Sequence, residues 1–171
     1  RRNSLYLKIM EKFYQNNLNY IRQHHLDKIC VVIAKITPYL TAALYALTLS
    51  YYLLIIHKAI IDNHLKPLSS FLIVTLIRKL YNRPRPCMTF NIEPLVGHKT
   101  GESFPSRHTV SAFAIAFALL NINIHLGIIA LIIACIVGLS RIICAVHFIS
   151  DVLLWFFNCI DHLFDITKFL F

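Results

Sequence analysis

The sequence predicts an all-α integral membrane protein, a bundle of about five transmembrane helices preceded by a helix on the membrane surface. Hydrophobic residues make up 57% of the 171 residues, charged residues make up only 15%, and the mean hydropathy is +0.63. A soluble domain of this size would have too little polar surface to cover itself. The length fits a single membrane-embedded domain over residues 1–171, without an internal repeat or a second domain.

An amphipathic helix is expected first, because residues 1–25 alternate apolar and charged positions at helical spacing. Such a helix would lie on the membrane surface, although a solvated tail fits the pattern equally well. The long apolar run 29–61 is expected to divide into an approach helix and a span from about Pro38 to Ile56, because proline disrupts helix interiors. Four further spans are expected at about 67–80, 105–124, 125–143 and 148–169.

Short polar segments set the ends of these spans. Two prolines and four cations in residues 78–86 end the second span, and Ser106 is placed as the N-cap of the third. The loop 87–104 is expected to be irregular, and a tight turn over 121–125 joins the third span to the fourth. With this count of crossings, the C-terminal ends of spans two and four and the N-terminal ends of spans three and five share one membrane face.

Charge and cysteine content exclude some classes of function. The formal net charge is +9, but the cations lie in short segments between apolar runs, where they can contact lipid headgroups or a phosphate. Nucleic acid is therefore not expected as a partner. The five cysteines are widely spaced and form no C-x2-C pair, so neither a zinc site nor a disulfide framework is indicated. Lysine and arginine normally accumulate on the cytoplasmic side of a membrane, but some of these cations are expected here to bind phosphate. Their distribution therefore leaves both membrane orientations open.

Polar side chains at the ends of the spans form a set suited to phosphoryl transfer. Negative charge is spread over the phosphate oxygens in this reaction, so a site needs several fixed donors. Arg85 and Arg141 offer guanidinium groups that match phosphate oxygens, and Ser106 stands at a helix N-terminus, which favours an anion. Asp151 follows His147 by four residues and can orient its imidazole as a nucleophile. The sequence therefore predicts a membrane phosphatase that acts on a lipid phosphate.

Three blocks in the middle of the chain carry a family resemblance. They are Arg85-Pro86, Pro105-Ser106-x-His108 and Ser140-Arg141-x5-His147-x3-Asp151. They resemble the signature K-x6-R-P, P-S-G-H and S-R-x5-H-x3-D of the type 2 phosphatidic acid phosphatase superfamily, and the third block is complete.

The resemblance covers residues 78–151 and implies a helical membrane bundle and a phosphatase that uses no metal or other cofactor. It also implies a covalent phosphohistidine at His147 oriented by Asp151. His108 would be the general acid that protonates the leaving group and later activates water.

Two positions depart from the family pattern. Arg78 occupies the position of the leading lysine and is the expected phosphate ligand there, with the adjacent Lys79 as the alternative. Arg107 replaces the glycine of the second block. Its side chain could contact a second phosphate or a headgroup, which would favour a diphosphate substrate, or it could face solvent without touching the substrate.

The resemblance also suggests a biological setting. The short chain, the five-span plan and the surface helix resemble the small bacterial members that dephosphorylate undecaprenyl diphosphate in cell-wall lipid recycling. Phosphatidic acid or phosphatidylglycerol phosphate fits the same motifs. By this analogy the protein lies in a bacterial plasma membrane with its active site on the extracytoplasmic side. The alternatives are an enzyme like the vanadate-dependent haloperoxidases, which are soluble members of the superfamily, and a non-catalytic membrane protein with a vestigial anion site.

Overall fold

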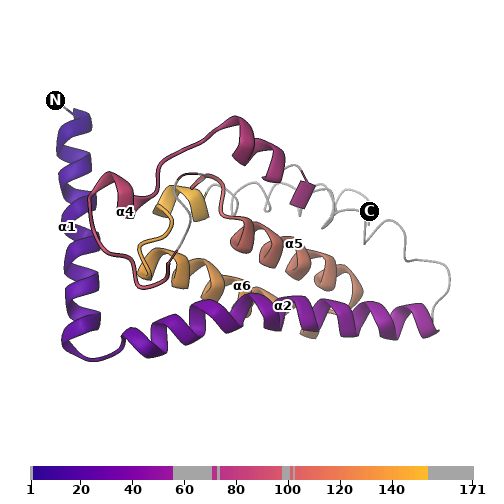
Figure 1. The fold of residues 1–171 in the computed structure, drawn as a ribbon. Coiled ribbons are helices and arrows are strands. Elements are labelled where there is room, and N and C mark those ends of the chain that lie inside the picture. The colour runs from indigo at the N-terminus through magenta and orange to yellow at the C-terminus, as the bar shows by residue number, and fades with distance from the viewer. Residues whose placement is uncertain (1, 56–70, 73, 98–100, 102, 154–171) are drawn as a thin grey trace.

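The computed structural model describes residues 2–55, 71–72, 74–97, 101 and 103–153. These residues form helices, turns and loops but no strand, which confirms the all-α prediction for this part of the chain. The labelled helices are α1 (Arg2–Gln23), α2 (Asp27–Ile55), α4 (Pro86–Thr89), α5 (Arg107–Ile122) and α6 (Ile124–Ile143). Helices α2, α5 and α6 pack against one another, and α1 crosses one end of this bundle (Figure 1).

Helix α1 is fastened to the bundle by one of its faces. Tyr14 and Leu18 on this face are buried, and they pack in an apolar cluster with Phe90 and Phe148. Other positions of α1 expose large apolar side chains, among them Leu5, Tyr6, Ile9 and Phe13. The predicted helix is therefore confirmed. Its exposed apolar side chains fit the predicted position at a membrane surface.

Helix α2 differs from the prediction, because it continues through Pro38 as one helix. Proline has no N–H and removes one hydrogen bond from a helix interior. Threonine hydroxyls supply donors in the same region: Thr37 Oγ1 donates to the carbonyl of Ile33 at 2.8 Å, and Thr41 Oγ1 donates to the carbonyl of Pro38 at 3.0 Å. Such local donors allow membrane helices to retain a proline. The expected division into an approach helix and a separate span was wrong.

Helices α5 and α6 are joined by a single residue, Asn123. Its Oδ1 accepts hydrogen bonds from two backbone N–H groups in the first turn of α6, at 2.9 and 3.1 Å. The connection is thus shorter than the predicted turn over 121–125, because one capping asparagine both ends α5 and begins α6. Gly127 permits this close return, since a Cβ at this position would lie 2.5 Å from Leu120.

The interface of α5 and α6 forms the main apolar core, in which small side chains are frequent. Its buried members are Ala112, Phe113, Ala116, Leu119, Ala130, Ala134 and Val137. The outer face of α6 exposes Ile128, Ile129, Ile132, Ile136 and Leu139. A small-residue interior beneath a large apolar exterior is typical of helices that pack within a bilayer.

Among the described residues, two helices are long and apolar enough to cross a membrane, Asp27–Ser50 and Ile124–Ile143. Helix α5 is apolar but shorter, at 16 residues. Residues 71–72 and 74–80 are helical, in agreement with the C-terminal part of the second predicted span, and a helix begins at Ile149, close to the start of the fifth. The remainder of these two spans lies outside the described residues, so the number of five spans stays a prediction.

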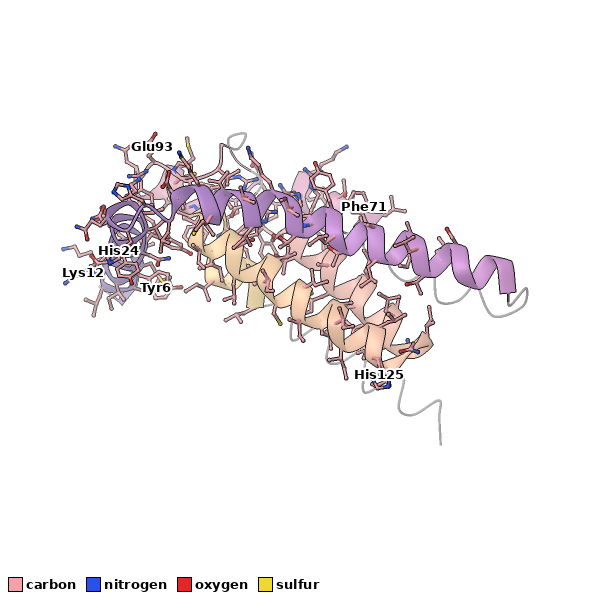
Figure 2. The ribbon with its side chains drawn as sticks, turned by 90° about the horizontal axis from the view of Figure 1, so that it is seen from below. Tyr6, Lys12, His24, Phe71, Glu93 and His125 are labelled. Atoms are coloured by element: carbon pink, nitrogen blue, oxygen red, sulfur yellow. The ribbon has the colours of Figure 1, made fainter. Side chains whose placement is uncertain are left out.

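The loop predicted over 87–104 is largely irregular where it is described, but it starts within a one-turn helix, α4. Pro86 is the first residue of α4, where the missing N–H breaks no helical hydrogen bond. This loop lies at the same end of the bundle as α1. Figure 2 shows Glu93 of the loop and His24 at this end, and His125 of α6 at the other.

Candidate active site

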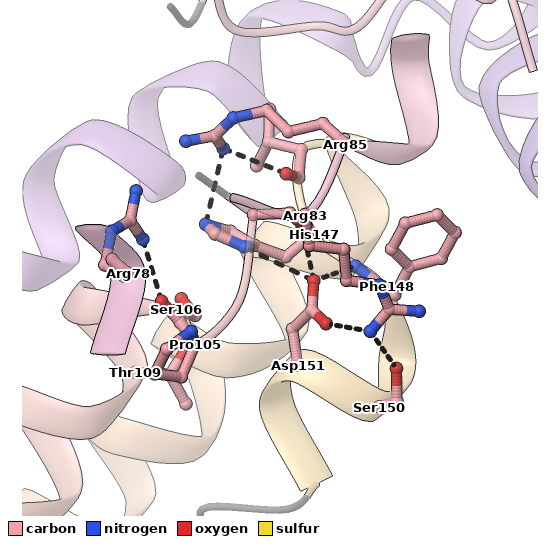
Figure 3. A network of polar contacts seen from close by, with 12 residues as sticks. Arg78, Arg83, Arg85, Pro105, Ser106, Thr109, His147, Phe148, Ser150 and Asp151 are labelled. Carbon is pink, nitrogen blue, oxygen red and sulfur yellow. Dashed lines mark hydrogen bonds and ion pairs between the residues drawn. The ribbon is translucent and has the colours of Figure 1, made fainter. Parts of the chain in front are cut away.

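Hydrogen bonds bring the three motif blocks together at one end of the bundle (Figure 3). Arg78 Nη1 donates to the carbonyl of Pro105 at 2.7 Å, which joins the end of the second predicted span to the start of α5. Arg85 Nη1 donates to the carbonyl of Val146 at 3.0 Å, which joins the Arg-Pro segment to the turn after α6. The predicted convergence of helix ends is therefore confirmed for the described residues.

His147 lies in the turn that directly follows α6. The chain reverses through Ala145, whose φ of 57° is in the left-handed region, and the His147 side chain is buried behind this turn. Its Nε2 lies 3.5 Å from Nη1 of Arg85, and its Nδ1 lies 3.8 Å from Oδ2 of Asp151 (Figure 3). The ring nitrogens therefore face groups of opposite charge. This arrangement favours the proton on Nδ1, beside the carboxylate, and leaves the Nε2 lone pair toward the guanidinium.

The protonation state of His147 follows from its burial. Loss of water around the charged imidazolium lowers the pKa of His147 from its ordinary value of 6.5. Asp151 acts in the opposite direction, whereas the positive charge of Arg85 adds to the lowering. The imidazole is therefore neutral at neutral pH, which is the form that can act as a nucleophile.

Asp151 is fully buried in the first turn of the helix that begins at Ile149. Its Oδ1 accepts a hydrogen bond from Arg83 Nη1 at 2.6 Å. Its Oδ2 accepts from Ser103 Oγ at 2.5 Å and from the backbone N–H of Phe148 at 3.0 Å. These donors offset the cost of burying a carboxylate and restrict its rotation. Hydrogen bonds within the protein therefore hold Asp151 in its orientation toward His147.

Arg83 belongs to this site, although the motif blocks did not predict it. Besides Asp151, its Nη1 contacts Ser150 Oγ at 3.0 Å, and its guanidinium lies 4.4 Å from the ring centroid of Phe148. The signal was present, because Arg83-Pro84 repeats the Arg-Pro pair of the first motif block two residues earlier. The family pattern includes only one Arg-Pro pair, which was assigned to Arg85-Pro86.

Two further contributors have no recognisable pattern in the sequence. Ser103 lies just before the second block and bonds Asp151, as described above. Tyr14 is fully buried in α1, and its hydroxyl donates to the backbone carbonyl of His147 at 3.0 Å. The N-terminal helix therefore supports the turn that carries the candidate nucleophile.

Three of the four predicted phosphate-binding arginines are buried: Arg78, Arg85 and Arg141 are 4%, 5% and 3% exposed. Each donates to at least one backbone carbonyl. A carbonyl orients a guanidinium but carries no net charge, so these contacts leave the positive charge available to an anion. Lys79 is exposed, and this difference in burial favours Arg78 as the cation of the first block.

Ser106 is the N-cap residue of α5, as predicted, and is fully buried. Its hydroxyl makes no capping bond; its Oγ accepts a hydrogen bond from Thr109 Oγ1 at 2.9 Å. Arg107 and His108 are the first two residues of α5, and their side chains are exposed. The contacts predicted for Arg107 and the acid–base role predicted for His108 stay predictions.

This set of side chains is suited to phosphoryl transfer. A neutral imidazole with a fixed carboxylate on one side and a buried guanidinium on the other can attack a phosphorus whose oxygens are held by arginines. Within the described ranges, three or more His, Cys, Asp or Glu side chains do not gather in an arrangement suited to a metal ion.

A family comparison agrees with this geometry. The model of the PAP2 superfamily matches residues 39–157, a range that includes all the motif blocks. The chain belongs to the PAP2 superfamily. It is therefore a membrane phosphatase of the PAP2 type that acts on lipid phosphates, as the motif blocks predict.

Two named bacterial proteins are similar to this PAP2 chain in sequence. Undecaprenyl-diphosphatase BcrC of Bacillus subtilis (strain 168) is 30% identical over 133 residues, which are 76% of this chain and 69% of that protein. Bacitracin transport permease protein BcrC of Bacillus licheniformis is 35% identical over 78 residues, which are 45% of this chain and 38% of that protein.

A solved structure supports the fold. The crystal structure of Aquifex aeolicus LpxE superimposes with a TM-score of 0.65 at 24% sequence identity, covering 84% of this chain and 86% of LpxE. At this identity the likeness concerns the helical arrangement only.

Proposed function

We propose that this PAP2 phosphatase removes the terminal phosphate of undecaprenyl diphosphate through a phosphohistidine at His147. The observation that carries the proposal is the position of His147, whose Nε2 lies 3.5 Å from Arg85 and whose Nδ1 lies 3.8 Å from Asp151. The named activity of the Bacillus subtilis relative supports the choice of substrate. Phosphatidic acid and phosphatidylglycerol phosphate are the next candidates, because the site recognises the phosphate itself.

In the first step, the Nε2 lone pair of His147 forms a bond to the terminal phosphorus. The bond from this phosphorus to the bridging oxygen breaks, and undecaprenyl phosphate leaves with a proton from His108. Asp151 stabilises the positive charge that develops on the imidazole, while Arg85 and Arg141 bind the phosphoryl oxygens.

In the second step, a water molecule attacks the phosphorus of phosphohistidine. His108, now neutral, accepts the proton of this water, and the P–N bond breaks. Inorganic phosphate is released and the His147 imidazole returns to its neutral form. Its lowered pKa favours this return, because burial disfavours the imidazolium.

The membrane arrangement in this proposal has five spans and an active site on the extracytoplasmic side of a bacterial plasma membrane. The apolar chain of the substrate lies against the bundle while its diphosphate meets the buried arginines. The α5–α6 connection at Asn123 then lies on the cytoplasmic side, because it is at the opposite end of α5 from Ser106. In an Asn123→Cys variant, the new thiol should not react with a membrane-impermeant thiol reagent in intact cells. Labelling from outside would show that the orientation is the opposite one.

The direct test is phosphate release by the detergent-purified chain over a panel of undecaprenyl diphosphate, phosphatidic acid and phosphatidylglycerol phosphate, with a chelator present. We expect release from undecaprenyl diphosphate to be fastest and to disappear in the His147→Ala variant. Full activity in this variant would remove the proposed nucleophile. Loss of wild-type activity with the chelator would contradict a reaction that needs no metal.

A further inference from the structure

Pro38 leaves one carbonyl in the interior of α2 without its usual donor. In an α-helix the N–H of each residue bonds to the carbonyl four residues earlier, so the missing donor at Pro38 belongs to the carbonyl of Ala34. Ala34 is fully buried, and it packs with Cys144 and Val146 from the turn that follows α6. A carbonyl that is freed at this depth needs a replacement donor, because an unsatisfied buried polar group is costly.

Arg141 supplies the replacement. Its Nη2 donates to the carbonyl of Ala34, so that a guanidinium from the end of α6 replaces the amide that proline lacks. The guanidinium is itself buried, and its Nε has no hydrogen-bond partner among the described residues. One edge of Arg141 is therefore fixed on α2, while a further donor and the whole positive charge remain for an anion.

We propose that Pro38 is a positioning residue for phosphate binding, acting through the Ala34 carbonyl that it frees for Arg141. Helix packing alone leaves the long arginine side chain several rotamers, and the free carbonyl selects one of them. Because both groups are shielded from water, this hydrogen bond is stronger than it would be at the surface. The inference rests on the proposed role of Arg141 as a phosphate ligand, and it adds a residue of α2 that is outside the motif blocks.

Pro38 also lies outside the region of the chain that matches the family model. The family match begins at residue 39, so both Pro38 and Ala34 precede it. The sequence signal is a proline in the middle of an apolar helix, which reads as a helix break when no tertiary contact is known.

The Pro38→Ala variant tests the proposal, because it restores an N–H that competes with Arg141 for the Ala34 carbonyl. The probe is orthovanadate, a phosphate analogue, titrated calorimetrically into the detergent-purified full chain. We expect vanadate binding to weaken about fivefold. Complete loss of a hydrogen bond to a charged group would weaken it roughly tenfold or more, but the new N–H only competes with Arg141 for the Ala34 carbonyl. The thermal midpoint should stay equal or rise, because alanine is the better helix former.

Thr41→Val is the matched control. It changes a hydroxyl contact in the same region of α2, where Thr41 Oγ1 bonds the carbonyls of Thr37 and Pro38, but it adds no amide donor at residue 38. Vanadate affinity should remain at the wild-type value in this variant. A second comparison adds Pro38→Ala to Arg141→Met, where the proline substitution should have no further effect.

Wild-type vanadate affinity in Pro38→Ala would overturn the proposal. The proposal would also be wrong if Pro38→Ala weakened vanadate binding as much in the Arg141→Met background as it does in the wild type. If Pro38→Ala does not fold, an ester in place of the amide between Ala34 and Lys35 weakens the same carbonyl as an acceptor while keeping the proline, and it should also weaken vanadate binding. Phosphate release by the His147→Ala variant tests the proposed function separately. That substitution removes the nucleophile and leaves the contact between Arg141 and Ala34 in place.

Discussion

Replacing Arg83 with glutamine tests whether Asp151 must be held in place for catalysis. Removal of one partner from a fully buried ion pair costs about 3–5 kcal/mol. The side chain of Arg83 is 30% exposed while that of Asp151 is 0% exposed, and the donors from Ser103 and Phe148 remain in the variant. We therefore expect a smaller loss, about 2 kcal/mol of unfolding free energy.

The kinetic effect of Arg83→Gln should fall on kcat. Arg83 contacts the carboxylate that orients His147, so its loss misplaces the nucleophile and should lower kcat by about 10- to 100-fold with little change in KM. The assay is steady-state phosphate release, together with the thermal midpoint in the same detergent. Arg83→Lys keeps the charge and should recover part of kcat. A wild-type kcat in Arg83→Gln would refute the reasoning.

A second ion pair provides the control for the loss of a charge. Arg22 and Glu93 lie 3.4 Å apart with side chains 44% and 84% exposed, so water screens their attraction. Glu93→Gln should change the unfolding free energy by less than about 0.5 kcal/mol and leave kcat unchanged.

Two further predictions concern His147. Tyr14→Phe removes the hydrogen bond to its backbone carbonyl and should lower the unfolding free energy by about 1 kcal/mol, with a fall in kcat; an unchanged kcat would show that α1 does not support the turn. Because burial lowers the pKa of His147, the neutral nucleophile should be present above pH 6.5 and be lost only as the pH falls through a lower value. The acid limb of kcat/KM, corrected for ionisation of the substrate, should therefore lie below 6.5, and a limb at or above 6.5 would contradict the buried environment.

The elements with strong local signals could be predicted from the sequence. The amphipathic pattern of residues 1–25 and the apolar run before Ile143 both gave helices in the expected places. The motif spacing predicted that Arg85, His147 and Asp151 would meet, because helix ends that lie on one membrane face are forced together. These inferences depend on periodicity and crossing number, which are properties of the linear sequence.

The features that were missed depend on contacts between distant segments. Pro38 has a helix-breaking propensity, but a guanidinium from α6 donates to the Ala34 carbonyl that the proline leaves without a helical donor, so α2 continues. Asn123 was placed within a longer turn, because capping geometry decides how few residues can join two helices. Tyr14 lies 133 residues from the carbonyl that it contacts, and no local pattern predicts such a pair.

The central claim is that the phosphoryl group passes through residue 147. The most direct measurement is to mix the purified chain with undecaprenyl diphosphate that carries a radiolabelled terminal phosphate, quench in alkali within one turnover, and map the labelled peptide. We expect an acid-labile, alkali-stable phosphoramidate on His147 that is absent from His147→Ala. Label on another residue, or phosphate release at the wild-type rate by His147→Ala, would contradict it.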